Sequence, residues 1–176
     1  MLRSVGVSVA LAALALGLVA ASAAASGGGI AARNAVALAA GDLDTSVLAG
    51  ARDALSIALR NLGAVALLAA GAPLLATLTL VALPVLGIGL GLSAAAVVEA
   101  LGPVETLQRV APYIAFELTG VVLAAASGIL PTVHALAMAA RRGSASLPRS
   151  YASALPASLA LTLVAALLIV IAACIE

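Results

Sequence analysis

The chain has 176 residues, of which 65% are hydrophobic and 9% are charged, and its formal net charge is +1. An average soluble domain carries roughly 25% charged residues, and a core of this length cannot hide so much apolar surface, so lipid must cover most of it. The near-neutral charge supplies no basic stripe for phosphates, which excludes nucleic acid as an expected partner.

Continuous apolar runs, without period-two alternation, predict an all-α, polytopic helical membrane bundle with about five transmembrane helices. We expect one integral membrane domain over residues 1–176. In chain order, the predicted spans are residues 5–25, 62–81, 84–101, 110–140 and 154–175. The second and third spans are expected to meet in a turn near Pro84.

The first span has two interpretations. Arg3, a long apolar run and the sequence ASAAAS before GGG fit a cleavable signal peptide. The apolar run is longer than the roughly 7–15 residues usual for a signal-peptide core, which favours an uncleaved membrane anchor.

Residues 26–60 form the longest stretch outside the predicted spans, and we expect them to be extracytoplasmic. Asp44, Thr45 and Ser46 provide a helix start signal. Apolar residues then recur at helical spacing, with polar residues on the opposite face: Leu48, Ala51, Leu55, Ala58 and Leu62 against Arg52, Ser56 and Arg60. The pattern predicts an amphipathic helix that lies at the outer interface and continues into the second span, either as a plain connection or as a partner-binding element.

Arginine placement predicts the orientation in the cell membrane. The loop before the last span carries Arg141, Arg142 and Arg149 without any acidic residue, so it is expected in the cytoplasm. With five spans, the N-terminus with Arg3 is then also cytoplasmic, and the C-terminal Glu176 is extracytoplasmic.

One carboxylate, Glu117, stands inside the fourth span. On a helix, Glu117, Gly120, Ala124 and Gly128 fall on one stripe, and small residues at such spacing let another helix approach closely. The stripe therefore predicts that Glu117 faces the bundle and does not face lipid.

A charge on the lipid face would cost several kcal/mol, so Glu117 is expected to have a partner or to be protonated. Tyr113 lies one turn outward on the same side of the helix. The polar candidates from other spans are Asn61, Arg60, Thr77 and Thr79. Of these, Asn61 and Arg60 lie nearest to the outer level of the membrane, where Glu117 is expected. Three roles for Glu117 are open: a structural link between helices, part of a partner-docking surface, or part of a substrate or ion path.

The remaining signals favour helix packing over chemistry. Gly87 and Gly91 have the spacing of a membrane-helix packing motif. The chain has one histidine, His134, and one cysteine, Cys174, which are too few to form a metal site. We expect His134 to fill space as a polar residue near the cytoplasmic interface and Cys174 to be an unreactive thiol. No second acid or nucleophile accompanies Glu117, so no catalytic residue, metal or cofactor is predicted.

Two stretches together resemble a known family. RNLGAVALLAAGAPLLATLTLVALPVLGIGLG (60–91) and APYIAFELTGVVLAAASGILP (111–131) are similar to the two hallmarks of the stage II sporulation protein M family. By position, Asn61, Glu117 and Gly128 match the family's polar and glycine sites. The chain departs from the pattern at Arg60, where the family has a second Asn, and at Tyr113-Ile114, where it has His-Gly.

The resemblance implies a membrane protein without catalytic activity that works beside peptidoglycan-degrading partners. We therefore expect a non-enzymatic scaffold or complex subunit of the cell envelope, with the lipid bilayer and unidentified proteins as partners. The alternative is a small transporter or channel component in which Glu117 titrates. An intramembrane enzyme is disfavoured, because the residues for a mechanism are missing.

Overall fold

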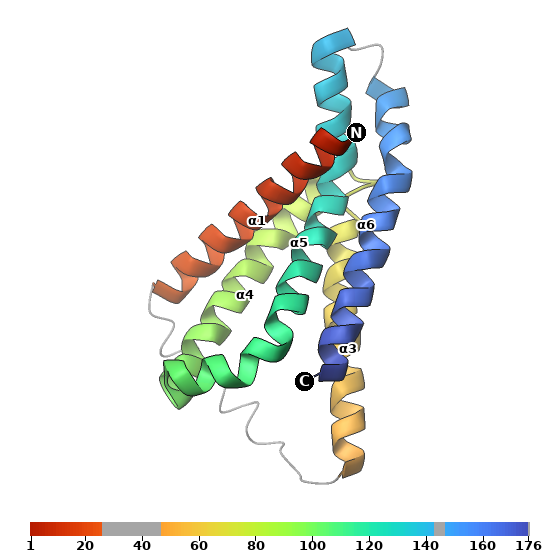
Figure 1. Cartoon of the computed structure of the whole chain (residues 1–176). Helices are drawn as coiled ribbons and strands as arrows, with labels where there is room; N and C mark the ends of the chain where they lie inside the picture. Colours follow the sequence, from red (N-terminus) through yellow and green to blue (C-terminus); the bar gives the residue numbers. More distant parts are fainter. Residues whose placement is uncertain (26–46, 143–146, 176) are drawn as a thin grey trace.

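The computed structural model of the chain describes residues 1–25, 47–142 and 147–175. Within these ranges the chain forms helices and no strand, so the predicted all-α class is confirmed. In chain order the helices are α1 (Leu2–Ala25), α3 (Val47–Ala69), α4 (Thr77–Leu101), α5 (Pro103–Arg142) and α6 (Leu147–Ile175). Figure 1 shows them side by side in an elongated bundle.

The helix α5 occupies the centre of the bundle. It contacts all four other described helices, with α1 and α4 on one side and α3 and α6 on the other (Figure 1). Among the described residues, α1 contacts only α4 and α5. The α5 helix is thus the element around which the fold is organised.

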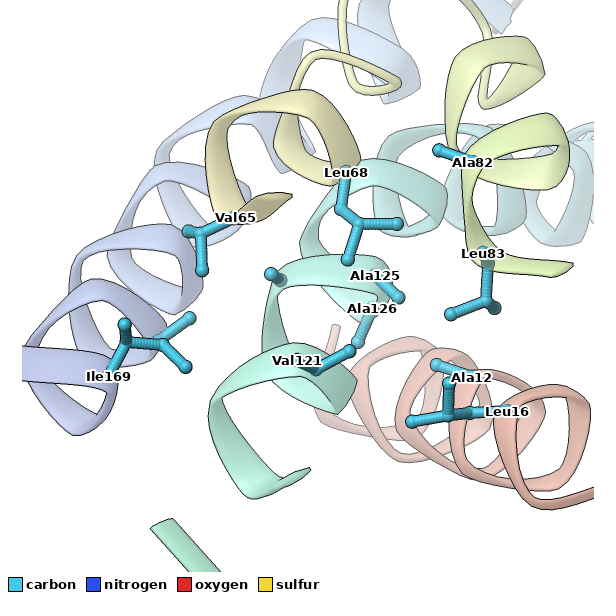
Figure 2. Close-up of a cluster of buried hydrophobic side chains, with 12 residues drawn as sticks. Ala12, Leu16, Val65, Leu68, Ala82, Leu83, Val121, Ala125, Ala126 and Ile169 are labelled. Atoms are coloured by element: carbon cyan, nitrogen blue, oxygen red, sulfur yellow. The ribbon is translucent and has the colours of Figure 1, made fainter. Parts of the chain in front are cut away.

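The buried core gathers side chains from all five helices around α5 (Figure 2). Half of these side chains are alanines, which let the helix backbones approach one another closely. The cluster consists of Ala12, Leu16, Val65, Leu68, Ala82, Leu83, Val121, Ala124, Ala125, Ala126, Ala165 and Ile169.

Four of the described helices, α1, α4, α5 and α6, are long and apolar enough to cross a membrane. Their outer faces carry large exposed side chains such as Leu14, Leu80 and Leu163, which are 61%, 62% and 63% exposed. A soluble monomer rarely exposes such extended apolar surface. The chain is therefore a multi-pass membrane protein.

The predicted second span, 62–81, is wrong as a single helix. The helix α3 ends at Ala69 and α4 begins at Thr77, so only the shorter stretch Ala58–Ala69 of α3 is strongly apolar. The predicted turn at Pro84 is also wrong, because Pro84 lies inside α4. Neighbouring helices make an interior proline tolerable in a membrane helix.

The chain instead reverses over residues 70–76, between α3 and α4. Gly71 and Pro73 favour a break here, since glycine tolerates unusual backbone angles and proline cannot donate a helical hydrogen bond. Leu75 and Ala76 complete the reversal with φ values of 53° and 67°. These left-handed angles cost roughly 1–2 kcal/mol per residue, and the surrounding contacts must offset that cost.

Side chains of α4 and α6 donate hydrogen bonds to backbone carbonyls at this break. Thr79 Oγ1 in α4 donates to the carbonyl of Leu68 in α3 at 2.7 Å. The Tyr151 hydroxyl in α6 donates to the carbonyl of Ala72. Irregular backbone at membrane depth is stable only where protein groups satisfy it in this way.

The other predicted spans lie within longer helices. Spans 5–25, 84–101 and 154–175 fall inside α1, α4 and α6, and 110–140 falls inside α5. The helix α5 begins earlier than predicted, at Pro103, because Gly102 (φ 79°) ends α4 and proline suits the first helical position. Figure 1 shows the first turns of α5 lying across one end of the bundle before the helix rises.

The predicted amphipathic segment is described only in part. From Val47 the chain is helical without interruption to Ala69, so a helix does continue into the second predicted span. The start signal at Asp44, Thr45 and Ser46 lies outside the described residues.

Candidate functional site

The carboxylate of Glu117 meets the amide of Asn61 across the interface of α3 and α5. Asn61 Nδ2 donates to Glu117 Oε1 at 2.7 Å, and both residues are partly buried. A short hydrogen bond to an ionised carboxylate is among the stronger kinds in proteins. The structure thus brings together the two polar residues that the sequence pattern placed at similar depth.

The small residues that follow Glu117 on α5 all face neighbouring helices. An added Cβ at Gly120 would lie 3.0 Å from Ile169 of α6, and Ala124 is 0% exposed. At Gly128 an added Cβ would overlap Thr79 Oγ1 and the Leu68 carbonyl. The predicted stripe therefore serves two interfaces: Gly120 packs on α6, and Gly128 packs on the α3–α4 break.

The other two predicted partners of Glu117, Tyr113 and Arg60, differ in burial. Tyr113 is partly buried on α5 and faces the same cavity as Glu117. Arg60 is exposed, whereas its neighbour Asn61 donates to the carboxylate.

A cavity of about 620 Å³ lies between α1, α4 and α5, and Glu117 forms part of its wall. Apart from Leu16, the α1 side of the wall is made of small residues between positions 13 and 24, including Gly17 and Ala21. Ser93, Thr106 and Tyr113 add hydroxyl groups to an otherwise largely apolar lining. Glu117 thus stands between two environments, the Asn61 amide on the α3 side and this cavity on the α1 side.

The glycine pair of α4 lies directly against α1. An added Cβ at Gly87 would meet Val19 at 3.0 Å, and one at Gly91 would overlap the carbonyl of Ala20. These two glycines set the close approach of α1 to α4, and this approach closes one side of the cavity.

A set of hydroxyl groups that the sequence analysis did not single out joins α5 to α6. Ser158 Oγ donates to the Ser127 carbonyl at 2.7 Å, and Thr162 Oγ1 lies 3.0 Å from Ser127 Oγ. Small hydroxyl residues inside apolar spans are the available signal for such links. About two turns after Ser127 on α5, His134 Nδ1 lies 3.1 Å from Ser4 Oγ of α1, which ties the start of α1 to the bundle.

Within the described ranges, no three His, Cys, Asp or Glu side chains lie close enough together to hold a metal ion. Cys174 is a free, exposed thiol near the end of α6.

Comparison with known proteins gave no match: no protein-family model, curated protein or solved structure is similar to this chain.

Proposed function

We propose that this protein is a non-enzymatic membrane scaffold or complex subunit, in which the Asn61–Glu117 contact holds the bundle in its partner-binding form. The observation that carries the proposal is the 2.7 Å hydrogen bond between α3 and α5. A carboxylate inside an apolar bundle is costly unless protein groups receive it, and an amide donor from another helix does so. Glu117 then acts by fixing where α3 lies on the central helix.

The nature of the partners comes from the resemblance to the stage II sporulation protein M family. That resemblance supports a place in the cell envelope beside other membrane or wall-associated proteins. The conformation of α3 is important here, because α3 connects the bundle to residues 26–46, the segment expected on the outer side. A bundle that fixes α3 also fixes Val47, the residue that directly follows this segment.

Crosslinking in native membranes followed by purification tests the proposal. Glu117→Gln keeps an oxygen that accepts from Asn61, so it should retain the same partners as the wild type. Glu117→Leu should lose them. Thr119→Leu is the matched control, because Thr119 is a polar residue on the exposed face of the same helix. Unchanged partners with Glu117→Leu would contradict the proposal.

A second candidate function depends on the cavity between α1, α4 and α5, which Glu117 also lines. Because the carboxylate also lines the cavity of about 620 Å³, it could bind and release a proton or cation during transport. In reconstituted vesicles, Glu117→Gln should then abolish a gradient-driven flux while thermal stability stays unchanged. Absence of any Glu117-dependent flux under proton, sodium or potassium gradients would remove this alternative.

A further inference from the structure

We propose that exposed arginines at one end of the bundle bind the phosphate groups of anionic phospholipids. This surface, the basic end, consists of Arg3 at the start of α1, Arg141 near the end of α5 and Arg149 near the start of α6. All three side chains are exposed. Neither the Asn61–Glu117 contact nor the cavity beside it belongs to this surface.

The register of α5 against α6 gives the heights of these residues along the bundle. Ser158 Oγ of α6 donates to the Ser127 carbonyl of α5, and the two helices run in opposite directions (Figure 1). Counting seven residues from each contact residue towards the basic end, at about 1.5 Å per residue, brings Tyr151 of α6 level with His134 of α5.

Two other parts of the chain end at the level of His134. His134 Nδ1 lies 3.1 Å from Ser4 Oγ, so α1 begins at this level. The Tyr151 hydroxyl donates to the Ala72 carbonyl, so the α3–α4 reversal lies there as well. In that reversal Leu75 is 66% exposed, and such an exposed leucine in a membrane protein indicates contact with lipid. The level of His134 therefore lies close to one edge of the hydrocarbon core.

The three arginines lie at or just beyond this level. Arg3 belongs to the first turn of α1, at the level itself. Arg149 precedes Tyr151 by two residues, or about 3 Å, and Arg141 follows His134 by seven residues, or about 10 Å. Headgroups extend the bilayer by about 5–8 Å on each side of its core, and long arginine side chains can reach back into that layer. Figure 1 shows α5 and α6 continuing past the N-terminus at this end.

The described protein supplies no acidic residue at the basic end. Residues 1–25, 134–142 and 147–175 contain neither aspartate nor glutamate. Along α5 the nearest carboxylate is Glu117, about 25 Å before His134. The acidic residues of the described ranges are Asp53, Glu99, Glu105 and Glu117. An external anion is therefore the partner that matches the charge of this surface.

The apolar residues beside the arginines select a lipid as the source of that anion. Leu2, next to Arg3, is 89% exposed, and Leu136, on the turns before Arg141, is 60% exposed. Exposed leucines next to exposed arginines suit the boundary where acyl chains meet headgroups. A guanidinium also matches phosphate geometry, because it can donate two parallel hydrogen bonds. In the predicted orientation this is the cytoplasmic leaflet, whose anionic lipids attract basic groups.

Lipid retention by the full-length protein tests the proposal. The protein is reconstituted in nanodiscs of phosphatidylglycerol and phosphatidylcholine in equal amounts with identical acyl chains. It is then released into mild detergent, and native mass spectrometry counts the lipids that remain bound. The wild type should retain phosphatidylglycerol at least about tenfold over phosphatidylcholine, since each arginine contributes up to about fivefold. Raising the salt during release from about 0.1 M to about 1 M should weaken this preference, because the Debye length shortens from about 10 Å to about 3 Å.

Paired variants locate the site on the molecule. Arg141→Gln combined with Arg149→Gln should reduce the preference to about twofold or less. Arg60→Gln combined with Arg109→Gln is the matched control, because it removes two exposed arginines away from the basic end and should leave the preference unchanged. Arg141→Lys combined with Arg149→Lys keeps the charge and should keep most of the preference, which separates loss of charge from loss of fold.

Three outcomes would overturn the proposal. Equal retention of the two lipids by the wild type would remove the headgroup preference. An equal loss in the Arg141/Arg149 and Arg60/Arg109 glutamine pairs would show that overall charge, and not the basic end, selects the lipid. A protein that crosslinks to the wild type in native membranes and is lost only from the Arg141/Arg149 glutamine pair, without any lipid preference, would assign the surface to an acidic protein instead.

Discussion

The hydroxyl of Thr79, in the first turn of α4, donates to the carbonyl of Leu68, in the last turn of α3, at 2.7 Å. Thr79 is fully buried, and the two residues stand on opposite sides of the chain reversal at 70–76. The bond replaces part of the backbone hydrogen bonding that a continuous helix would have supplied. It also lies against Gly128 of α5, so the reversal is joined to the central helix at the same point.

Replacing Thr79 with valine should destabilise the protein by about 1 kcal/mol. Valine has nearly the same shape, so the change removes the hydroxyl donor from a buried carbonyl and leaves the packing in place. Thermal or denaturant unfolding in detergent micelles measures the loss. Thr77→Val is the control, since Thr77 is exposed at the start of the same helix. Equal stability of the two variants would mean that the bond contributes nothing.

Gly128→Ala should cost about 1–3 kcal/mol, because the new methyl group would overlap Thr79 Oγ1 and the Leu68 carbonyl. In a helix with open space the same change stabilises by roughly 0.5–1 kcal/mol. Gly63→Ala in α3 offers that comparison, since its Cβ would meet no atom within 4 Å. The two variants should therefore shift the unfolding midpoint in opposite directions. A shared sign would show that Gly128 has no special packing role.

The Asn61–Glu117 contact predicts a coupling free energy of about 1 kcal/mol between the two sites. A double-mutant cycle with Asn61→Leu, Glu117→Leu and the double variant measures it by unfolding in micelles. Each single variant should lose stability relative to the wild type, because it removes one side of the contact between α3 and α5 and leaves the other polar group there. The double variant should therefore lose less stability than the two single variants together. Strictly additive effects would show that the two side chains do not stabilise each other.

The predicted orientation can be measured with the natural thiol. Cys174 is the sole cysteine of the sequence and is exposed near the end of α6. A membrane-impermeant maleimide added to intact cells should label it from outside. In a Cys174→Ser background, Arg149→Cys should be labelled only after the cells are opened, because Arg149 lies at the other end of α6. The reverse pattern would invert the proposed topology.

The sequence alone predicted the all-α class of fold and the position of Glu117 on a packed helix face. Long apolar runs predict helices that are covered by lipid. The stripe from Glu117 to Gly128 has the spacing of a packed helix face. The structure places Gly120, Ala124 and Gly128 against neighbouring helices and Asn61 at the carboxylate. These features follow from residue type and from local helical geometry.

The position of the α3–α4 break could not be predicted with the same rules. Pro84 looks like the stronger breaker in sequence, yet the bundle accommodates it inside α4. The reversal instead uses left-handed angles at Leu75 and Ala76, and neither residue type favours that conformation. Tertiary contacts from Thr79 and Tyr151 stabilise a turn that no local signal specifies.

The hydroxyl links between α5 and α6 were missed for a related reason. Ser127 and Ser158 are 31 residues apart, and their meeting depends on the register of two helices against each other. Helical periodicity gives the face on which a residue lies but not its height relative to another helix. The cavity beside Glu117 is likewise formed by three helices and has no signature in any one of them.

The central place of α5 has a consequence for biosynthesis. The chain is made from the N-terminus, so α1, α3 and α4 emerge before the helix that all of them contact. Within the described part of the chain, α1 contacts only α4 and α5, so it has neither of these partners until the later helices have been made. The complete bundle can therefore form only after residues 103–142 have been inserted, and until then lipid or the insertion machinery must cover the faces of the earlier helices that contact α5.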